Sequence, residues 1–231
     1  MNEVLRQEKK YLISLDQMYA YSQYFGGVMM QDAHNGAEGY AIRSLYFDTL
    51  ENRDFEEKEN GLALRRKIRL RCYDAADSFA MLEMKQKQGA MQKKRSLRMK
   101  REDAMQLVRG EYGVLLSYEE AFARECYAVM NMHCYRPRAV VEYRRKAFIA
   151  KENKIRITFD HQIKATESNM DLFSAKLVQN TVLDTYLAVL EVKYNGFLLS
   201  YIKDLLQCCD SSELSVSKYC LSRSVSTHYR F

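Results

Sequence analysis

The sequence lacks, or has few of, several features that mark particular classes of protein. It holds one proline, nine glycines and no tryptophan in 231 residues, which argues against a loop-rich chain or a long disordered linker. None of its six cysteines lies in a CxxC pair, and none of its four histidines lies in an HxH or HExxH motif. Structural zinc sites and histidine metal sites are therefore disfavoured. No apolar run reaches the ~18 residues that a membrane-spanning helix needs.

The cysteines and the N-terminal residues indicate the compartment. Cys208 and Cys209 are adjacent, and the first ten residues carry too many charges for a secretory signal. Disulfides are rare in the cytosol, so the cysteines of this chain are expected to stay reduced. We therefore expect a cytoplasmic protein that does not insert into a membrane, and we leave open a membrane-protein partner.

Length and charge distribution set the scale of the fold and the kind of partner. The chain has no internal repeat, coiled coil or composition break that would mark a linker, so we expect a single domain over residues 1–231. Its net charge is only +6, but between Gly61 and Arg101 there are 13 lysines and arginines against three acids. A patch this basic predicts an anionic partner, such as nucleic acid, a membrane surface or a phosphate compound.

The basic segment has the pattern of a strand. Alternate positions from Arg65 to Arg71 are all basic, and the positions between them are apolar except for Arg66. Successive side chains of a β-strand point to opposite faces, so this segment predicts one cationic face and one apolar face. The same alternation recurs in other segments of the chain.

The remaining periodicity predicts an α+β fold dominated by long antiparallel strands. Segments 61–73 and 79–87 would pair as a hairpin across residues 74–78. Asp16 would cap the first helix, and residues 89–94 would form a basic loop. We expect strands over residues 4–13, 41–48, 61–73, 79–87, 137–149, 154–164 and 186–194, and helices over 16–25, 101–109, 117–131 and 197–207.

The charged strand faces combine many cations with a few carboxylates. One ordinary interpretation is a half-buried sheet whose polar face lies in water, but such a face would more often use Thr, Ser and Gln. If the faces line a cavity, like charges at close range there are unfavourable until a polyanion enters. Arginine binds phosphate oxygens in a fork, and carboxylates could hold a divalent metal that bridges those oxygens. The acids concerned are Glu8 beside Lys10, Glu83 beside Lys85, Asp160 beside Arg156, and Glu191 beside Lys193.

Seven short motifs occur in the order and approximate spacing of a known family. The chain resembles the VTC domain, the catalytic module of the vacuolar transporter chaperone complex, within the triphosphate tunnel metalloenzyme or CYTH-like superfamily. The resemblance implies an antiparallel β-barrel that forms a tunnel, with helices packed on the outside. It implies a phosphotransferase that uses Mn or Mg and moves the γ-phosphate of ATP onto a growing polyphosphate chain. The motifs are EKKY, IRLR, LEMK, YRRKAF, RITFD, LEVKY and SVSKY, and they span roughly residues 5 to 222.

The resemblance also implies roles for individual residues. It gives Glu191 as the metal-binding glutamate, and we expect Glu8 or Glu83 to help hold the metal. It also gives Ser217, and from the strand faces we expect Tyr143 and Lys67 to join Ser217 in contacting the bound nucleotide or phosphate. The catalytic cations carried over by motif are Lys10, Arg69, Arg71, Lys85, Arg145, Arg156, Lys193 and Lys218.

One departure from the superfamily pattern favours the polyphosphate branch. The superfamily opens with ExExK, whereas this chain has Arg6 at the first acidic position and keeps only Glu8 and Lys10. Two alternatives stay open: a metal-dependent triphosphatase acting on nucleoside or inorganic triphosphate, and a non-catalytic module that binds polyphosphate or nucleic acid. Basic residues 93–101 lack the aromatic stacking motif of RNA-binding sheets, so no specific nucleic-acid partner is expected.

Overall fold

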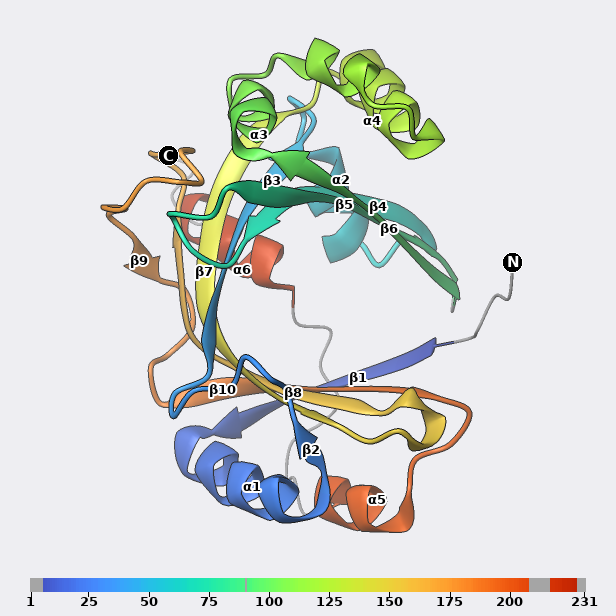
Figure 1. Ribbon diagram of the computed structural model, residues 1–231, viewed down its shortest axis with the longest axis vertical. Coiled ribbons are helices and arrows are strands. Elements are labelled where there is room, and N and C mark those ends of the chain that lie inside the picture. Colours follow the sequence, from blue (N-terminus) through green and yellow to red (C-terminus); the bar gives the residue numbers. More distant parts are fainter. Residues whose placement is uncertain (1–5, 90, 208–216, 228–231) are drawn as a thin grey trace. The chain divides into compact units, whose positions relative to one another are not determined.

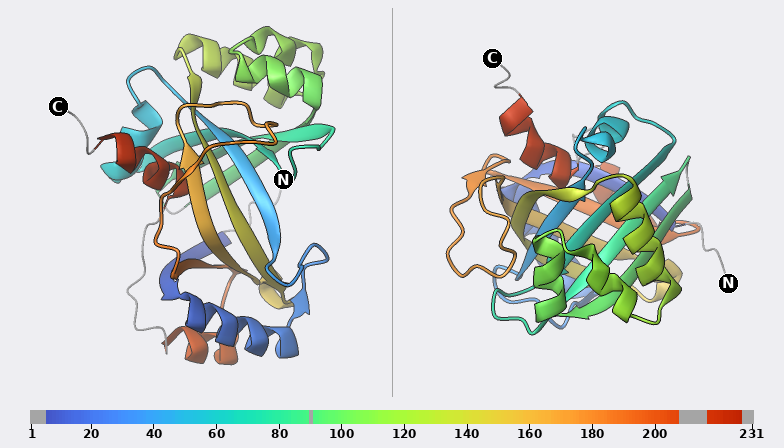
Figure 2. Two further views of the ribbon diagram at one scale, coloured as in Figure 1. Left: turned by 90° about the vertical axis from the view of Figure 1, so that its left-hand side faces the viewer. Right: turned by 90° about the horizontal axis from the view of Figure 1, so that it is seen from above.

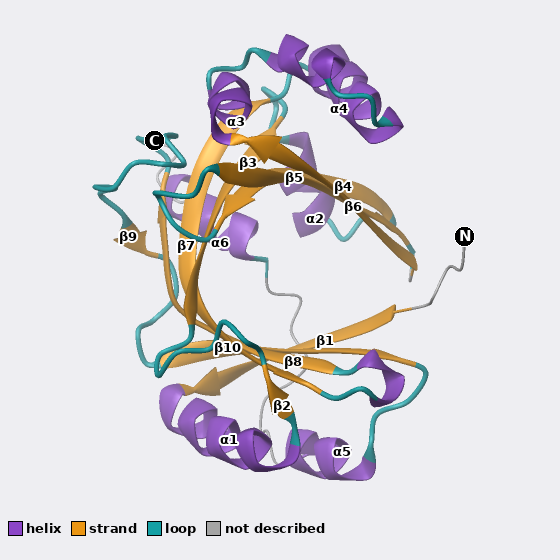
Figure 3. Cartoon of the chain, viewed as in Figure 1, coloured by secondary structure: helices purple, strands orange, loops and turns teal. Residues whose placement is uncertain are grey.

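The computed structural model describes residues 6–89, 91–207 and 217–227, and it shows a mixed architecture of long strands and shorter helices (Figures 1 and 3). The strands are β1 (Arg6–Ser14), β2 (Met30–Gln31), β3 (Tyr40–Asp48), β4 (Leu64–Cys72), β5 (Phe79–Gln88), β6 (Met91–Lys100), β7 (Arg136–Ile149), β8 (Arg156–Thr166), β9 (Asn180–Thr181) and β10 (Leu187–Asn195). The helices are α1 (Leu15–Val28), α2 (Arg53–Glu59), α3 (Arg101–Val108), η1 (Tyr112–Ser117), α4 (Ala121–Met132), η2 (Glu152–Lys154), α5 (Ser200–Gln207) and α6 (Lys218–Thr227).

The strands form a large antiparallel sheet that is not closed into a barrel. Hydrogen bonds connect them in the order β1-β10-β8-β7-β3-β4-β5-β6, while β2 pairs with β7 and β9 with β8. Within the described residues β1 and β6 are the two ends of this path and do not pair with each other. The predicted α+β class is confirmed, but the hydrogen-bonded closure of a barrel is not present. Alternation along a strand sets its faces, and it does not determine which edges of a sheet meet.

Contacts group the chain into two compact units. The first unit comprises Met1–Ala41, Tyr143–Ile163 and Leu183–Ser217, and the second comprises Ile42–Glu142, Lys164–Val182 and Lys218–Phe231. Strands β3, β7 and β8 contribute residues to both. Among the described residues, no helix combines the length and the apolar character needed to cross a lipid bilayer. The expectation of one domain over residues 1–231 stays a prediction.

In the first unit, helices cover one face of the sheet. Figure 1 shows α1 and α5 along the same side of β1, β10 and β8. Ser14 caps the N-terminus of α1. Its side chain accepts a hydrogen bond from the Gln17 backbone N–H, while the Gln17 side chain accepts one from the Ser14 backbone N–H. This capping box replaces the predicted Asp16 cap. Phe25 of α1 packs on Phe148 and Phe159 of the sheet, with ring centroids 6.0 and 6.2 Å apart.

In the second unit, β3, β4, β5 and β6 place their apolar positions on one side. The hairpin of β4 and β5 pairs in the predicted order. Buried Ile68 and Leu70 of β4 join Leu82 of β5 and Leu97 of β6 in one core cluster with residues of α3 and α4. Figure 2 shows α3 and α4 lying over this sheet in both of its views. The predicted loop over residues 89–94 is wrong from residue 91 onward, because β6 continues the sheet beside β5.

Candidate phosphate-binding faces

Each unit has a charged sheet face on the side opposite its helix-covered core. In the first unit, Tyr11, Leu190 and Ile157 point into the core, so their chain neighbours point to the other side. Pairing across the strands places Lys10 opposite Glu191, and Glu191 opposite Thr158. The next row places Glu8 opposite Lys193, and Lys193 opposite Arg156. We call this surface the first charged face; its residues are Glu8, Lys10, Arg145, Arg156, Thr158, Asp160, Glu191 and Lys193.

The lysines of the first charged face are paired with its glutamates. The Lys10 Nζ lies 2.9 Å from Glu8 Oε1, and the Lys193 ammonium contacts the Glu191 carboxylate. Burial alone would lower the pKa of Lys10, but the charges of Glu191 and Glu8 raise it above its ordinary value. Lys10 therefore stays protonated and cationic across the physiological range.

Arg145 of β7 is held by a buried carboxylate. Its Nε donates to Asp160 Oδ1 at 2.6 Å and its Nη2 to Asp160 Oδ2 at 2.7 Å, and the Asp160 side chain is fully buried. The Arg145 guanidinium also lies 5.4 Å from the centre of the Tyr143 ring. Asp160 thus fixes the orientation of an arginine that the sequence assigned to phosphate.

Arg156 is held by the loop that precedes β3. Its Nη2 donates to Asp32 Oδ2 at 2.7 Å and to the Tyr40 hydroxyl at 3.1 Å. Asp32 also contacts the His34 Nδ1 at 2.9 Å. Burial alone would raise the pKa of Asp32, but hydrogen bonds from His34 and Arg156 lower it.

That loop approaches β7 closely because of a glycine. Gly39 has φ +79°, and a Cβ at this position would lie 2.2 Å from the Arg145 carbonyl oxygen. Asn35 adds two bonds to β7, donating to Ala147 O at 2.7 Å and accepting from Ala147 N at 3.0 Å. The loop is therefore fixed to the strand that carries Arg145.

In the second unit one carboxylate organises three cations. Glu83 of β5 lies 2.7 Å from Arg69 Nη2, 2.6 Å from Arg71 Nη2 and 2.7 Å from Lys94 Nζ. Its side chain is only 3% exposed. Burial alone would raise the pKa of Glu83, but the charges of Arg69, Arg71 and Lys94 lower it to about 2. Glu83 is ionised at any physiological pH and holds both arginines of the IRLR motif in place.

Three lysines form a row on the same face, and one of them, Lys94, also pairs with Glu83. Lys67 of β4 is opposite Lys85 of β5, and Lys85 is opposite Lys94 of β6. Like charges directly across a sheet destabilise one another, so an anion placed over this row would be favoured. We call Lys67, Arg69, Arg71, Glu83, Lys85 and Lys94 the second charged face.

Ser217 and Lys218 lie at the start of α6, and buried hydrogen bonds anchor that helix in the second unit. The Tyr219 hydroxyl donates to Asp48 Oδ2 at 2.6 Å. The Asp48 carboxylate also accepts from the backbone N–H groups of Asp54 at 2.8 Å and Phe55 at 3.0 Å, at the first turn of α2. Asp48 thus joins α2 and α6, two α-helices that sequence analysis did not predict.

The structure divides the predicted site residues, apart from Ser217 and Lys218 at the start of α6, into two groups. It brings Glu8, Lys10, Tyr143, Arg145, Arg156, Glu191 and Lys193 together in the first unit, and Lys67, Arg69, Arg71, Glu83 and Lys85 in the second. Sequence analysis did not assign Asp32 or Lys94, and it noted Asp160 without giving it a role. Leu97 and Met99, which alternate with Ser96 and Arg98, are the signal that could have revealed β6 and with it Lys94.

The carboxylates allow a limited protein contribution to a divalent metal. Within the described residues, no three side chains of His, Cys, Asp or Glu converge as a metal cluster would require. Glu8 and Glu191 share the first charged face, whereas Glu83 belongs to the second unit and is surrounded by cations. Mg²⁺ in phosphate-handling sites is commonly bound by one or two carboxylates plus substrate phosphates and waters. Glu8 and Glu191 supply that number of carboxylates on one face, where each contacts a lysine. The metal assignment of all three glutamates stays a prediction.

Comparison with solved structures shows similar folds at very low sequence identity. A candidate adenylate cyclase from Bacillus halodurans aligns with a TM-score of 0.53 and 10% identity, over 92% of this chain and 95% of that one. A Pyrococcus horikoshii protein gives a TM-score of 0.48 and 9% identity, over 96% of this chain and 99% of that one. At these identities the first match supports the fold alone, and the second carries no weight.

Comparison with sequences identifies the family. No curated protein matches the chain. The sequence profile of the VTC domain matches residues 5–227, nearly the whole length, and includes every motif from EKKY to SVSKY. This match agrees with the resemblance drawn from the motifs. The chain belongs to the VTC domain family.

Proposed function

We propose that this chain is a metal-dependent polyphosphate polymerase, which transfers the γ-phosphate of ATP to the end of a polyphosphate chain. Family membership supports a phosphate-handling enzyme. The observation that carries the proposal is the pair of arginines, Arg69 and Arg71, fixed on one strand by the carboxylate of Glu83. Guanidinium groups preset in this way suit the oxygens of linked phosphates, because little side-chain entropy is lost on binding.

The reaction needs alignment and positive charge more than covalent help from the protein. An oxygen of the acceptor's terminal phosphate forms a bond to the γ-phosphorus, the bond from that phosphorus to the β-phosphate oxygen breaks, and ADP leaves. Arg69, Arg71 and Lys85 would stabilise the charge that develops on the transferred group and on ADP. Within the first unit, Glu8 and Glu191 would hold a divalent metal, which would neutralise charge on phosphate bound at the first charged face.

The first charged face would bind phosphates as well. Lys10 and Lys193 would guide the acceptor or product chain, while Arg145 and Arg156 keep their orientation through Asp160 and Asp32. Glu83 would take a different role from the metal ligand that we expected from the sequence. With three cations around its carboxylate, it would act as a positioning residue for Arg69 and Arg71 and not as a metal ligand.

The test is to incubate purified protein with ATP and Mn²⁺ and to separate the products. A ladder of polyphosphate together with ADP supports the polymerase. Release of phosphate without a ladder supports the triphosphatase, and no turnover with retained polyphosphate binding supports a binding module. Arg69→Ala should lower turnover, because it removes roughly 2–4 kcal/mol of transition-state stabilisation, by analogy with loss of one oxyanion donor. Arg109→Ala is the matched control, because Arg109 is an exposed arginine of the second unit that pairs with Glu111.

A further inference from the structure

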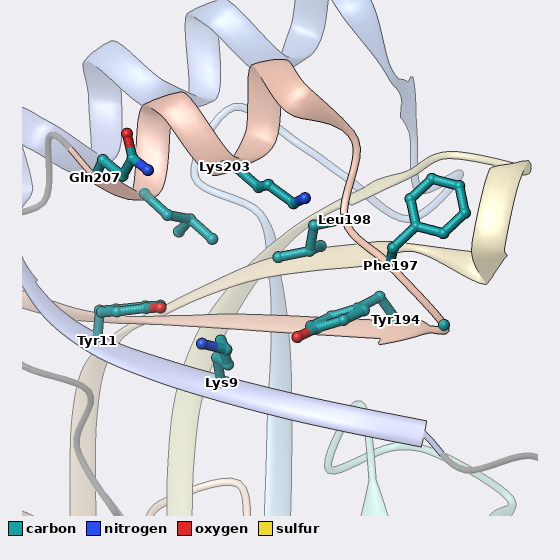
Figure 4. A pocket seen from close by; sticks show the side chains of 9 residues that line it. Lys9, Tyr11, Tyr194, Phe197, Leu198, Lys203 and Gln207 are labelled. Atoms are coloured by element: carbon teal, nitrogen blue, oxygen red, sulfur yellow. The ribbon is translucent and has the colours of Figure 1, made fainter.

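A cavity of about 430 Å³ lies on the side of the first unit's sheet that faces α5. Its walls come from β1, β10 and the segment from β10 into α5 (Figure 4). Lys9, Tyr11 and Tyr194 line it, and their chain neighbours Lys10 and Lys193 belong to the first charged face. Because adjacent residues of a strand point to opposite sides, the cavity and the charged face are separate sites on the same two strands.

The cavity is largely apolar and has a firm floor. Tyr11 and Tyr194 are 9% and 5% exposed, and Leu198 and Leu206 are 6% and 8% exposed. The Tyr194 hydroxyl donates to Gln7 Oε1 at 2.6 Å, which fixes the ring. Figure 4 shows the two tyrosine rings along the strands, with Leu198 and the helix on the other side. An apolar or aromatic ligand between these walls would be removed from water, and the burial of its apolar surface would favour binding.

Two cations reach this apolar space from opposite sides. Lys9 comes from β1 and Lys203 from α5 (Figure 4). Among the residues that the structure describes, no carboxylate forms an ion pair with Lys203. An ammonium group beside apolar walls favours a ligand that brings an anion to the rim and buries the rest of its surface.

We propose that this cavity binds a small amphiphilic anion, with an aromatic or short aliphatic body and one carboxylate, sulfonate or phosphate group. The body lies between the tyrosine rings and Leu198 and Leu206, and the anion lies between Lys9 and Lys203. The volume of about 430 Å³ falls within the ~300–1,000 Å³ typical of small-molecule sites. Phe197, whose side chain is 63% exposed, forms part of the wall at the mouth.

The experiment uses 8-anilinonaphthalene-1-sulfonate, a fluorescent aromatic sulfonate, as the probe. The full chain should bind one equivalent with a dissociation constant of roughly 1–100 µM, and the affinity should fall with added salt because the anion is paired with lysine. Lys203→Glu should weaken binding by about tenfold or more, since it replaces an attractive charge with a repulsive one. Phe197→Ala should weaken binding about threefold through lost apolar contact.

Lys151→Glu is the matched control, because Lys151 is an exposed lysine of the same unit that does not line the cavity. It should leave the dissociation constant unchanged. All variants should keep the circular dichroism spectrum of the wild type, since the substituted side chains lie outside the core clusters. The proposal is overturned if the wild type shows no saturable binding of one equivalent, or if Lys203→Glu and Phe197→Ala both bind as the wild type does. Neither result depends on whether the chain makes polyphosphate.

Discussion

Arg145 and Asp160 form a bidentate ion pair in which two nitrogens of the guanidinium meet two oxygens of a fully buried carboxylate at 2.6 and 2.7 Å. The Asp160 side chain is fully buried and the Arg145 side chain is 12% exposed, so the buried carboxylate depends on this arginine for its charge to be compensated. Removing one partner of a buried pair leaves an uncompensated charge, which is more costly than replacing both.

Asp160→Asn should therefore lower the free energy of unfolding by roughly 3–5 kcal/mol. The measurement is a urea titration followed by circular dichroism. Added tripolyphosphate should recover part of the loss if Arg145 binds phosphate, because the ligand replaces the missing anion. Glu111→Gln, which breaks the exposed pair with Arg109, is the control and should leave the unfolding midpoint unchanged. An Asp160→Asn protein as stable as the wild type would contradict this account of the pair.

Glu83 should make stability depend on pH in the acid range. Its pKa is lowered from 4.5 to about 2 by Arg69, Arg71 and Lys94 against the opposing effect of burial. A carboxyl whose pKa is lower in the folded state stabilises the fold above its unfolded pKa, and that contribution is lost as the pH falls from about 4.5 towards 2. The loss should total roughly 3 kcal/mol. Glu83→Gln should lack this slope in denaturation measured between pH 5 and pH 2.

The same variant separates the two roles considered for Glu83. If Glu83 positions the arginines, Glu83→Gln should lower turnover while the Mn²⁺ concentration at half-maximal rate stays the same. Binding of tripolyphosphate should become tighter, since one competing negative charge is gone. A large rise in the Mn²⁺ requirement would instead support the metal-ligand role expected from the sequence.

Asp54 should produce the opposite pH dependence. It is 1% exposed, and burial together with the charge of Asp48 raises the pKa of Asp54 to about 8, while the hydrogen bond from Tyr135 at 2.9 Å acts the other way. Between about pH 4 and pH 8 the folded protein keeps a proton that the unfolded chain has lost, so stability falls as pH rises, by about 1.4 kcal/mol for each pH unit at most.

Asp54→Asn imitates the protonated side chain and should remove this slope. Melting temperatures measured from pH 5 to pH 8 would then fall for the wild type and stay nearly level for the variant. Glu56→Gln alters an exposed carboxyl of the same helix and is expected to follow the wild type. Parallel curves for the wild type and Asp54→Asn would show that Asp54 is ionised in the folded protein.

Gly39→Ala should disturb the strand that carries Arg145. The added Cβ would lie 2.2 Å from the Arg145 carbonyl oxygen, and φ is +79°. Backbone strain alone costs about 1 kcal/mol, and the clash adds to it. Gly110→Ala is the matched control, because Gly110 has φ +83° but open space around its Cβ position. The difference in unfolding free energy between the two variants measures the close approach of the loop to β7.

The sequence predicted which face of each strand is buried, but it did not predict which strand edges pair or which residues form ion pairs. Alternation correctly placed Lys10, Arg69 and Glu191 opposite the core, because a strand with one buried side must put its apolar residues there. Strand β6 was missed because the run Lys93, Lys94, Arg95 hides its alternation. Helix α2 was missed because it is short and highly charged, and its N-cap residue Asn52 makes no side-chain capping bond.

Counter-ions were the hardest features to predict. Asp32 holds Arg156 from a position 124 residues away in the chain, and only the folded loop brings them together. Glu83 could be placed on a cationic face from its position in the strand. The three cations that it binds depend on the register of β4 and β6 on either side of β5, which no local pattern specifies. The prediction of a closed barrel was wrong for a similar reason, because the alternation of residues along a strand does not determine which distant strand edges pair.

The carboxylates seated among the arginines bear on how a long polymer could travel through such an enzyme. A cation that is already paired with a carboxylate of the protein gains little free energy when a phosphate replaces that carboxylate, because the two anions are similar partners. The exchange of a carboxylate for a phosphate is then close to neutral in free energy, so a bound phosphate can dissociate as readily as it binds. If the chain is the proposed polymerase, Glu83 would in this way keep phosphate binding weak enough for the product to advance by one unit after each transfer.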